Sequence, residues 1–268
     1  MPLPPRSGAR NRSAERALLA RLREFFAQRF GSLRGAHAAF APGRTNLLGA
    51  HLDYNGGPVL PVALDRGTGV VARLRSDRRL RFASLDAEPA LEVEARELRP
   101  DPGHGWGNYP LGAVAACREV WGDLPGADFL FGGNLPIGAG LSSSASLLLA
   151  TAFVYALLTD RPVERRALVD LVWRAETEFV GVRCGIMDPF ASALGRRGRI
   201  LYLDCGSLEF EHLPFGDGAP AVVVADTGVR RALASSGFNA CVAECRSALE
   251  KLRLRRPGLP SLASLGEE

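Results

Sequence analysis

The sequence GNLPIGAGLSSSA occupies residues 133–145 and should determine how the chain around it folds. A mostly apolar run at 127–131 precedes it and a strongly helical segment at 145–158 follows it. In the order strand, glycine-rich loop, helix, backbone N–H groups can surround an oxyanion, and the free N–H groups of the first helical turn point to the same place. Three consecutive serines, 142–144, add hydroxyl donors and N-cap candidates. The pattern predicts a polyphosphate site; the alternative is a helix N-terminus with a flexible entry.

Two common types of phosphate loop do not fit these residues. A Walker A loop needs a lysine directly after its last glycine, and the only lysine in the chain is Lys251. A dinucleotide-binding fingerprint needs a third glycine, and Ser143 stands in its place. The spacing P-x-G-x-G-L-S-S-S-A instead resembles the phosphate-binding loop of the GHMP family of small-molecule kinases, which includes galactokinase, homoserine kinase and mevalonate kinase.

The composition of the chain is that of a globular protein without nucleic-acid or membrane partners. Its 268 residues suffice for one large domain or two small ones, and 47% of them are hydrophobic against 23% charged. The net charge of +4 arises from scattered basic residues rather than from a dense basic stripe with interleaved aromatic residues, which argues against a nucleic-acid groove. The first 12 residues have no apolar core, so no secretory signal is expected, and the longest largely apolar run, 145–158, is too short to cross a bilayer.

The cysteines and histidines do not form a metal-binding pattern. The five cysteines include no C-x-x-C pair, and the four histidines are scattered along the chain. Reduced thiols in a cytoplasmic protein are the simplest interpretation.

A second informative segment lies at residues 41–64 and reads APGRTNLLGAHLDYNGGPVLPVAL. Asparagine followed by two glycines at 55–57 predicts a turn between strands, and Asp53 could be no more than a turn residue. However, Arg44, His51 and Asp53 lie within ten residues of one another and would make a polar rim suited to the hydroxyls of a sugar. The segment closely resembles the galactokinase signature G-R-x-N-L-I-G-E-H-x-D-Y-N-G-G, which favours the functional interpretation.

The third informative segment is AETEFVGVRCGIMDPFASALG at residues 175–195. Asp188 followed by Pro189 predicts a helix start, with aspartate at the N-cap and proline at position N1. In galactokinases the same turn, G-I-M-D-Q, carries the catalytic aspartate. A helix N-terminus would also favour the charged form of that carboxylate.

Two further segments fit the same family. Residues 106–112, WGNYPLG, resemble a galactokinase motif near the nucleotide, although Trp106 and Tyr109 could equally be core residues. Residues 226–239, DTGVRRALASSGFN, resemble the galactokinase segment D-S-x-V-x-H-x-L-x-x-S-x-Y-N.

Hydrophobic periodicity predicts helices and short strands along the whole chain. The expected helices cover residues 13–30, 111–120, 145–158, 163–180 and 240–254, and the expected strands cover 38–41, 68–74, 80–84, 90–93, 199–203 and 221–225. We expect residues 1–12 to be a disordered lead, with Ser13 capping the first helix.

The resemblance to galactokinases implies a mixed α/β (α+β, two-layer) fold of the ribosomal protein S5 domain 2-like type. Residues 13–215 would form this GHMP N-terminal domain, which binds sugar and ATP, and residues 216–268 would begin an incomplete ferredoxin-like C-terminal domain. The implied activity is transfer of the γ-phosphoryl group of ATP to a sugar hydroxyl, usually the anomeric one. A monomer is favoured, although the sequence leaves the oligomeric state open.

The resemblance also implies roles for individual residues. Asp188 would be the base or electrostatic partner of the attacking hydroxyl, and Arg44 beside it would favour the ionised form of Asp188 and steady the transferring phosphoryl group. Ser144 and Glu176 would bind Mg²⁺, which prefers hard oxygens and bridging phosphates. Sugar binding would involve His51, Asp53 and Gly185, with Asn46 supporting the loop. ATP binding would involve Gly138, Gly140, Ser142, Ser143, Ser144 and Trp106.

The chain departs from the galactokinase pattern in several places. Ala50 occupies the position of a sugar-binding glutamate, and Leu52, Phe238 and Pro189 are less polar than the family residues. Loss of a hydrogen-bonding partner weakens discrimination between sugars by about 1–3 kcal/mol. Galactokinases also continue past this point with a second glycine-rich loop that is not found after residue 239. We therefore expect a fragment, a truncated product or a descendant without that half, with an exposed apolar face where the half would pack.

Three functions remain open from the sequence. The first is an ATP-dependent galactose 1-kinase. The second is a related kinase for another sugar, such as N-acetylgalactosamine or arabinose, which Ala50 favours. The third is a non-catalytic protein that binds sugar and ATP. The missing C-terminal half favours it, whereas the retention of Arg44, Glu176 and Asp188 argues against it.

Overall fold

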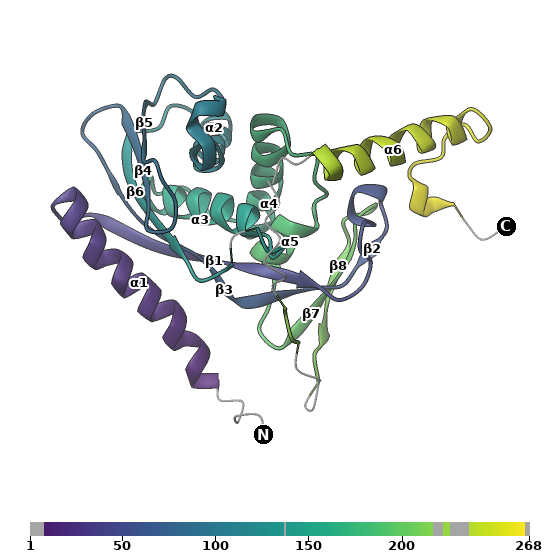
Figure 1. Ribbon diagram of the computed structural model, residues 1–268, viewed down its shortest axis with the longest axis horizontal. Helices are drawn as coiled ribbons and strands as arrows, with labels where there is room; N and C mark the ends of the chain where they lie inside the picture. The colour runs from purple at the N-terminus through teal and green to yellow at the C-terminus, as the bar shows by residue number, and fades with distance from the viewer. Residues whose placement is uncertain (1–7, 137, 217–221, 226–235, 266–268) are drawn as a thin grey trace.

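The computed structural model describes residues 8–136, 138–216, 222–225 and 236–265 of the chain. Within these residues the strands form two sheets (Figure 1). The larger sheet has five strands in the order β1-β3-β6-β4-β5, and the smaller has three in the order β2-β7-β8. Paired strands are antiparallel except for β4 and β6, which are parallel. The strands are β1 (Ala36–Asn46), β2 (Pro58–Val59), β3 (Pro61–Leu74), β4 (Arg79–Ser84), β5 (Leu91–Glu94), β6 (Ala127–Gly133), β7 (Arg199–Asp204) and β8 (Phe210–Pro214).

Helices connect and cover these strands. The α-helices are α1 (Gly8–Phe30), α2 (Asn108–Trp121), α3 (Ser143–Leu158), α4 (Arg165–Arg174), α5 (Met187–Leu194) and α6 (Ser236–Arg253). The short helical turns are η1 (Asp53–Asn55), η2 (Pro102–Gly107), the π-helical η3 (Ala175–Val180) and η4 (Leu262–Ser264).

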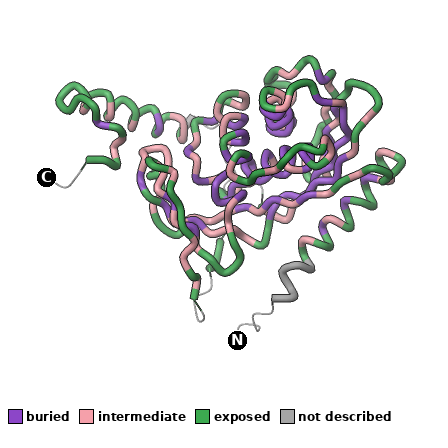
Figure 2. The backbone as a smooth tube through the Cα atoms, turned by 180° about the vertical axis from the view of Figure 1, so that it is seen from behind, coloured by how far each residue is buried: buried purple, intermediate pink, exposed green. Residues whose placement is uncertain are grey.

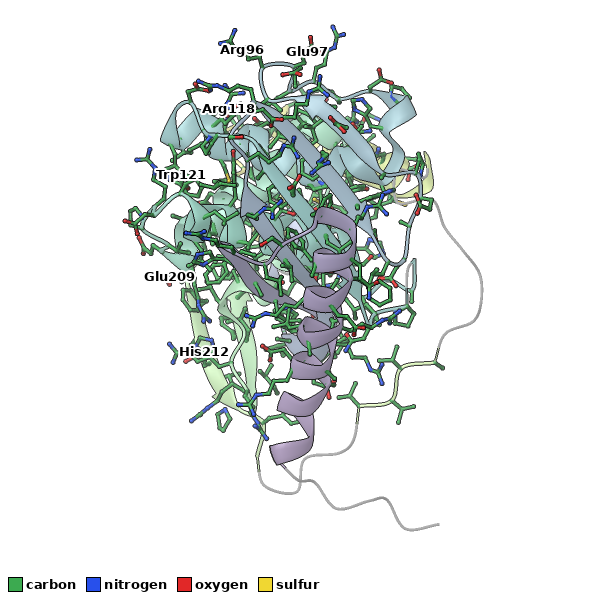
Figure 3. All side chains as sticks on the ribbon, turned by 90° about the vertical axis from the view of Figure 1, so that its left-hand side faces the viewer. Arg96, Glu97, Arg118, Trp121, Glu209 and His212 are labelled. Carbon is green, nitrogen blue, oxygen red and sulfur yellow. The ribbon has the colours of Figure 1, made fainter. Side chains whose placement is uncertain are left out.

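The five-stranded sheet is covered on both faces. One face packs against the helical layer that contains α2, α3, α4 and α5, and together they enclose the main core. The other face packs against α1, which crosses it as a separate helix (Figure 3). Alternation along β3 explains this arrangement, because Val70 and Ala72 face the main core while Val71 between them faces α1. Figure 2 shows the buried segments concentrated along the sheet and the helices packed on it, whereas α6 is mostly exposed.

Strand β6 is central, and its position fixes the loop that follows it. Phe129 and Phe131 point into the main core, and Leu130 points toward α1. Because both faces of β6 are covered, its sequence is an almost continuous apolar run rather than an alternating one. Its last residue, Gly133, starts the glycine-rich loop, and α3 starts ten residues later at Ser143. The predicted order of strand, loop and helix is confirmed.

The predicted mixed α/β architecture is confirmed, with differences at the ends of elements. Helix α1 begins at Gly8, so residues 8–12 are helical rather than part of a disordered lead. The segment predicted as one helix at 163–180 is divided into α4 and the π-helical η3. Strand β1 extends to Asn46 instead of ending near residue 41, because it continues past an irregularity between Pro42 and Arg44.

The strand predicted at 221–225 is wrong for the residues that the structure describes. Residues 222–225 have no regular secondary structure, and Val222, Val223 and Val224 are exposed. A valine run satisfies strand propensity, but a strand also needs a partner for its backbone groups. Most of the predicted motif at 226–239 lies outside the described residues. Where one domain ends and another begins stays a prediction.

In the parts of the chain that the structure describes, no helix combines the length and the apolar character required to cross a membrane.

Candidate active site

The glycine-rich loop presents the start of α3 as a site for an anion. Gly138, Gly140 and Ser142 all have left-handed backbone conformations, with φ of 74°, 73° and 59°. Ser142 occupies the N-cap position of α3, but it makes no side-chain hydrogen bond to the helix. Ser142, one of the three serines predicted as N-cap candidates, therefore occupies the N-cap position without capping the helix through its side chain. Because no side chain caps the helix, the N–H groups of its first turn stay available for a ligand.

Contacts with the neighbouring strands hold the loop in place. The Asn134 side-chain oxygen accepts a hydrogen bond from the N–H of Gly67 at 2.8 Å, and the Gly133 N–H donates to Asp86 Oδ2 at 2.6 Å. The N–H of Arg44 donates to the carbonyl oxygen of Leu141 at 3.1 Å. The loop is therefore attached both to the large sheet and to the turn after β4.

Two buried serines fix the bend in β1 that precedes Arg44. Ser146 of α3 donates to the Ala41 carbonyl at 2.7 Å, and Ser192 of α5 donates to the Pro42 carbonyl at 2.5 Å. A register shift lies between Pro42 and Arg44. Such bulges redirect side chains near functional sites. Here the bulge directs Arg44 toward α5.

Arg44 and Asp188 form an ion pair between residues that lie 144 positions apart in the chain. The Arg44 Nε and Nη2 atoms lie 2.7 and 2.6 Å from Asp188 Oδ1, and Arg44 Nη1 donates to the Gly140 carbonyl at 2.8 Å. The Ser142 hydroxyl donates to Asp188 Oδ2 at 2.6 Å. Both carboxylate oxygens are thus held, one from β1 and the other from the glycine-rich loop. The predicted proximity of Arg44 and Asp188 is observed.

The predicted N-cap role of Asp188 is wrong. Ile186 occupies the N-cap position of α5, and Asp188 lies within the first helical turn. Its carboxylate binds the side chains of Arg44 and Ser142 instead of the backbone of its own helix. An aspartate in the first turn still benefits from the positive end of the helix dipole.

Glu176 is a buried carboxylate beside the glycine-rich loop. It is only 3% exposed, and its Oε2 atom has no hydrogen-bond partner. Burial raises its pKa to about 7, a hydrogen bond from Ser144 opposes this shift, and the charge of Asp188 adds to it. Ser144 is also buried, in the first turn of α3. Ser144 and Glu176, predicted to share an ion, are therefore brought together.

This pair fits a divalent cation that also binds phosphate. An unpartnered buried carboxylate oxygen next to a hydroxyl supplies the hard oxygen ligands that Mg²⁺ prefers. Among the described residues, no group of three or more histidine, cysteine, aspartate or glutamate side chains could hold a metal ion. An ion bound here would therefore complete its coordination with phosphate oxygens and water.

Asp53 lies close to Gly185 and near the ion pair of Arg44 and Asp188. A Cβ atom on Gly185 would lie 2.1 Å from Asp53 Oδ2, so the backbone at Gly185 touches this carboxylate. Burial and the charge of Asp188 raise the pKa of Asp53, while the charge of Arg44 lowers it. The charges of Asp53, Asp188 and Arg44 therefore influence one another, as expected for groups in one site.

His51 and Asn46, also predicted for the sugar site, are placed differently. His51 is exposed with φ of 65°, and its Nδ1 atom forms a 2.7 Å hydrogen bond with the Tyr54 hydroxyl. Asn46 ends β1 two residues after Arg44, which places both side chains on the same face of the strand. The Asn46 Oδ1 atom is buried without a partner.

A pocket of about 260 Å³ adjoins the first turn of α3. Trp106 lines it, packs edge-on against Phe131 at 6.0 Å and donates its indole N–H to the Pro89 carbonyl at 2.9 Å. Trp106 thus has both of the roles that the sequence left open, because it packs on the core and forms a pocket wall. The remaining lining residues are Thr68, Ser84, Asp86, Ala87, Tyr109, Gly132, Gly133, Leu135, Ser143, Ser144 and Leu147.

Sequence analysis missed the contribution of the turn after β4. Asp86 and Ala87 line the pocket because β4 runs parallel to β6, so that the ends of the two strands meet at one edge. Knowledge that β4 and β6 pair in parallel would have revealed that Asp86 and Ala87 lie beside the glycine-rich loop, but the sequences of the two strands do not specify this pairing.

Comparison with known proteins assigns this arrangement to a family. Residues 24–74 match the galactokinase galactose-binding signature, and residues 108–196 match the N-terminal domain of GHMP kinases. The chain belongs to the GHMP kinase family. Its members use ATP. The two matched ranges contain Arg44, Asp53, the glycine-rich loop and Asp188.

Galactokinases are prominent among the relatives of this chain. The chain is 40% identical to the galactokinase of Halalkalibacterium halodurans over 245 residues, which cover 91% of the chain and 62% of that relative. It is 41% identical to the galactokinase of Exiguobacterium sibiricum over 249 residues, which cover 92% of the chain and 63% of that relative. The chain thus spans about three fifths of the length of these curated relatives.

Solved structures agree with this relationship. The galactokinase of Lactococcus lactis, crystallised in complex with galactose, superposes with a TM-score of 0.83 at 34% identity, and the match covers 92% of this chain and 64% of that one. The mevalonate kinase of Methanococcus jannaschii superposes with a TM-score of 0.58 at 18% identity, a likeness that concerns the fold alone.

Proposed function

We propose that this GHMP kinase phosphorylates galactose, transferring the γ-phosphoryl group of ATP to the anomeric hydroxyl. The observation that supports this most strongly is the position of Asp188, which lies between Arg44 on the sugar-signature segment and Ser142 of the glycine-rich loop. A residue held between an acceptor site and a phosphate site can act on the hydroxyl that attacks the phosphorus. The curated relatives that are 40% and 41% identical to the chain are galactokinases, which supports the same activity.

In this proposal Asp188 orients the anomeric hydroxyl and accepts its proton. The hydrogen bonds from Arg44 and Ser142 restrict the carboxylate to one orientation, which reduces the entropy lost when the reacting groups align. Phosphoryl transfer requires mainly positioning and stabilisation of developing charge. The Arg44 guanidinium and the free N–H groups at the start of α3 provide positive potential near the transferring group.

Ser144 and Glu176 would hold Mg²⁺, which neutralises charge on the phosphates when it is bound. Glu176 must be ionised to act as a ligand. Its pKa is near 7 in the absence of a cation, and a cation bound beside it would favour the ionised form. The pocket beside Trp106 would take the nucleoside of ATP, because it combines apolar walls with access to the serines at the start of α3.

Asp53, His51 and Gly185 would contact the sugar, and Asn46 at the end of β1 would support the loop that contains His51 and Asp53. Asp53 is suited to accept hydrogen bonds from sugar hydroxyls, because its carboxylate is half-buried beside Asp188. Gly185 lets the backbone approach this carboxylate closely.

A related sugar is the second candidate substrate, and the segment around Ala50 favours it. Ala50 is exposed and cannot form hydrogen bonds through its side chain, and its neighbours Leu47, Leu48 and Leu52 are exposed apolar residues. An acceptor that lacks one hydroxyl, or carries an acyl group in its place, would lose less binding affinity beside these apolar residues than beside a carboxylate.

A substrate panel distinguishes these candidates. ADP release would be measured with Mg²⁺-ATP and galactose, N-acetylgalactosamine, arabinose or no sugar, using the wild type, Asp188→Asn and the surface control Asp123→Asn. We expect galactose-dependent turnover that Asp188→Asn lowers by a factor of about 10² or more and that the control retains. Turnover with another sugar alone would assign that sugar. Saturable sugar or ATP binding without any turnover would contradict the kinase activity and favour a binding protein.

A further inference from the structure

The first turn of α6 contacts two loops that belong to the acceptor site. One loop contains His51 and Asp53, and the other, residues 181–186, leads into α5 and Asp188. These loops are more than 100 positions apart in the chain, and neither is a regular strand or a long helix. The contact between Gly185 and Asp53 joins them directly, and an element that touches both loops would further restrict their relative positions.

Phe238 packs against the first of these loops. Its ring stacks on the His51 imidazole, with centroids 6.4 Å apart and planes 30° apart, and meets the Tyr54 ring edge-on at 5.6 Å. The His51 and Tyr54 rings also meet edge-on, at 5.8 Å, and share the hydrogen bond at Nδ1. Three rings thus contact one another in every pairing.

His51 needs such support because its backbone is in a sparsely populated region. Its φ of 65° is left-handed, a conformation that costs a residue with a side chain about 1 kcal/mol or more and persists only where surrounding contacts enforce it. Asn55 supplies one further contact, because its amide donates to the His51 carbonyl at 2.8 Å and also reaches the Cys245 sulfur on α6 at 3.6 Å.

Asn239, the next residue of α6, holds the second loop. Its side-chain oxygen accepts a hydrogen bond from the backbone N–H of Arg183 at 3.0 Å. Arg183 precedes Gly185 by two residues, and Gly185 touches the Asp53 carboxylate. The hydrogen bond therefore acts on the segment that brings Gly185 against Asp53.

We propose that the first turn of α6 positions the acceptor site, with Phe238 fixing the His51 side chain and Asn239 fixing the 181–186 loop. This inference rests on the proposed sugar kinase function. Phe238 acts through His51, since its ring has no group that could form a hydrogen bond with a sugar hydroxyl and it stacks on the His51 ring. Both residues are positioning residues rather than catalytic ones.

The first test is kinetic and uses Phe238→Leu, which keeps apolar volume but removes the ring. Because a ring pair contributes about a factor of ten at most, we expect the KM for galactose to rise about tenfold, with kcat within about threefold and the KM for ATP unchanged. Phe238→Tyr, which keeps the ring, should retain the wild-type KM. The matched control is Leu254→Ala, which removes an exposed apolar side chain directly after the end of α6 and should leave the KM for galactose unchanged.

A double-mutant cycle separates positioning from direct sugar contact. If Phe238 acts through His51, combining Phe238→Leu with His51→Ala should raise the KM no further than His51→Ala alone. Additive losses would overturn the inference, and so would an equal rise in the Leu254→Ala control.

The second test does not depend on turnover. Amide hydrogen exchange at residues 181–186 should be about five- to tenfold faster in Asn239→Ala than in the wild type, whereas Leu254→Ala should leave it unchanged. Unchanged exchange in Asn239→Ala would overturn the role of α6 in holding this loop. Absence of sugar-dependent turnover in the wild type would instead refute the proposed function, and the exchange measurement would still decide whether α6 fixes the loop.

Discussion

The buried carboxylate of Glu176 should make the stability of the metal-free protein depend on pH. Burial raises its pKa to about 7, compared with 4.5 for a free side chain. The unfolded chain therefore loses this proton at lower pH than the folded one, so the folded state is favoured at low pH. This contribution to stability is fully present below about pH 4.5 and is lost as the pH rises toward 7.

The magnitude follows from the difference between the two pKa values. A difference of about 2.5 units corresponds to about 3 kcal/mol at 1.36 kcal/mol per unit. About 1 kcal/mol of this is already lost at about pH 5, and nearly all of it at about pH 8. The neutral isostere Glu176→Gln avoids the loss. Relative to the wild type, the variant should therefore gain about 2 to 3 kcal/mol of unfolding free energy between these two pH values.

Urea denaturation in the presence of a chelator, at about pH 5 and pH 8, measures this gap. Glu178→Gln, at an exposed carboxylate two positions away, is the matched control and should not reproduce it. Addition of Mg²⁺ and ATP at about pH 8 should stabilise the wild type more than Glu176→Gln, because only the wild type offers an anionic ligand. Unfolding free energies that change in parallel with pH for the wild type and Glu176→Gln would refute the reasoning.

Three other perturbations have defined outcomes. Gly185→Ala should raise the Kd for galactose by about tenfold or more, with the Kd for ATP unchanged in calorimetry, because the added Cβ would lie 2.1 Å from Asp53 Oδ2 and must displace it. Ser142→Ala should lower kcat by about tenfold without loss of sugar affinity, since Asp188 Oδ2 loses a 2.6 Å hydrogen bond; an unchanged kcat would show that Arg44 alone orients the carboxylate. Asp128→Asn should cost about 2–3 kcal/mol in urea denaturation near pH 7, because Asp128 is fully buried and binds three arginines. Burial alone would raise the pKa of Asp128, but the hydrogen bonds from these arginines together lower it. The difference in unfolding free energy between wild type and variant should therefore shrink as the pH falls below about 4.

Local sequence predicted the elements whose cause is local. The glycine-rich loop was predictable because its glycines, its serines and the flanking apolar runs specify strand, loop and helix within thirty residues. Helix α1 was predictable from the spacing of Leu18, Leu22 and Phe26, which form its buried stripe.

Features that depend on distant contacts were not predictable in the same way. Asp188 before Pro189 has the pattern of an N-cap, but Arg44 and Ser142 compete for the carboxylate, and neither is near it in the sequence. Their proximity was expected only from the resemblance to galactokinases. The three rings at His51, Tyr54 and Phe238 had no sequence signal, because their contact depends on how α6 docks.

The product of the reaction tests the central claim most directly. Purified protein would be incubated with Mg²⁺-ATP and galactose, and the products would be followed by phosphorus NMR for the wild type and Asp188→Asn. Our account predicts a sugar phosphate whose phosphorus couples to the anomeric proton, formed by the wild type and reduced by a factor of about 10² or more in the variant. Phosphorylation at another hydroxyl, equal formation by both proteins, or no sugar phosphate at all would contradict it.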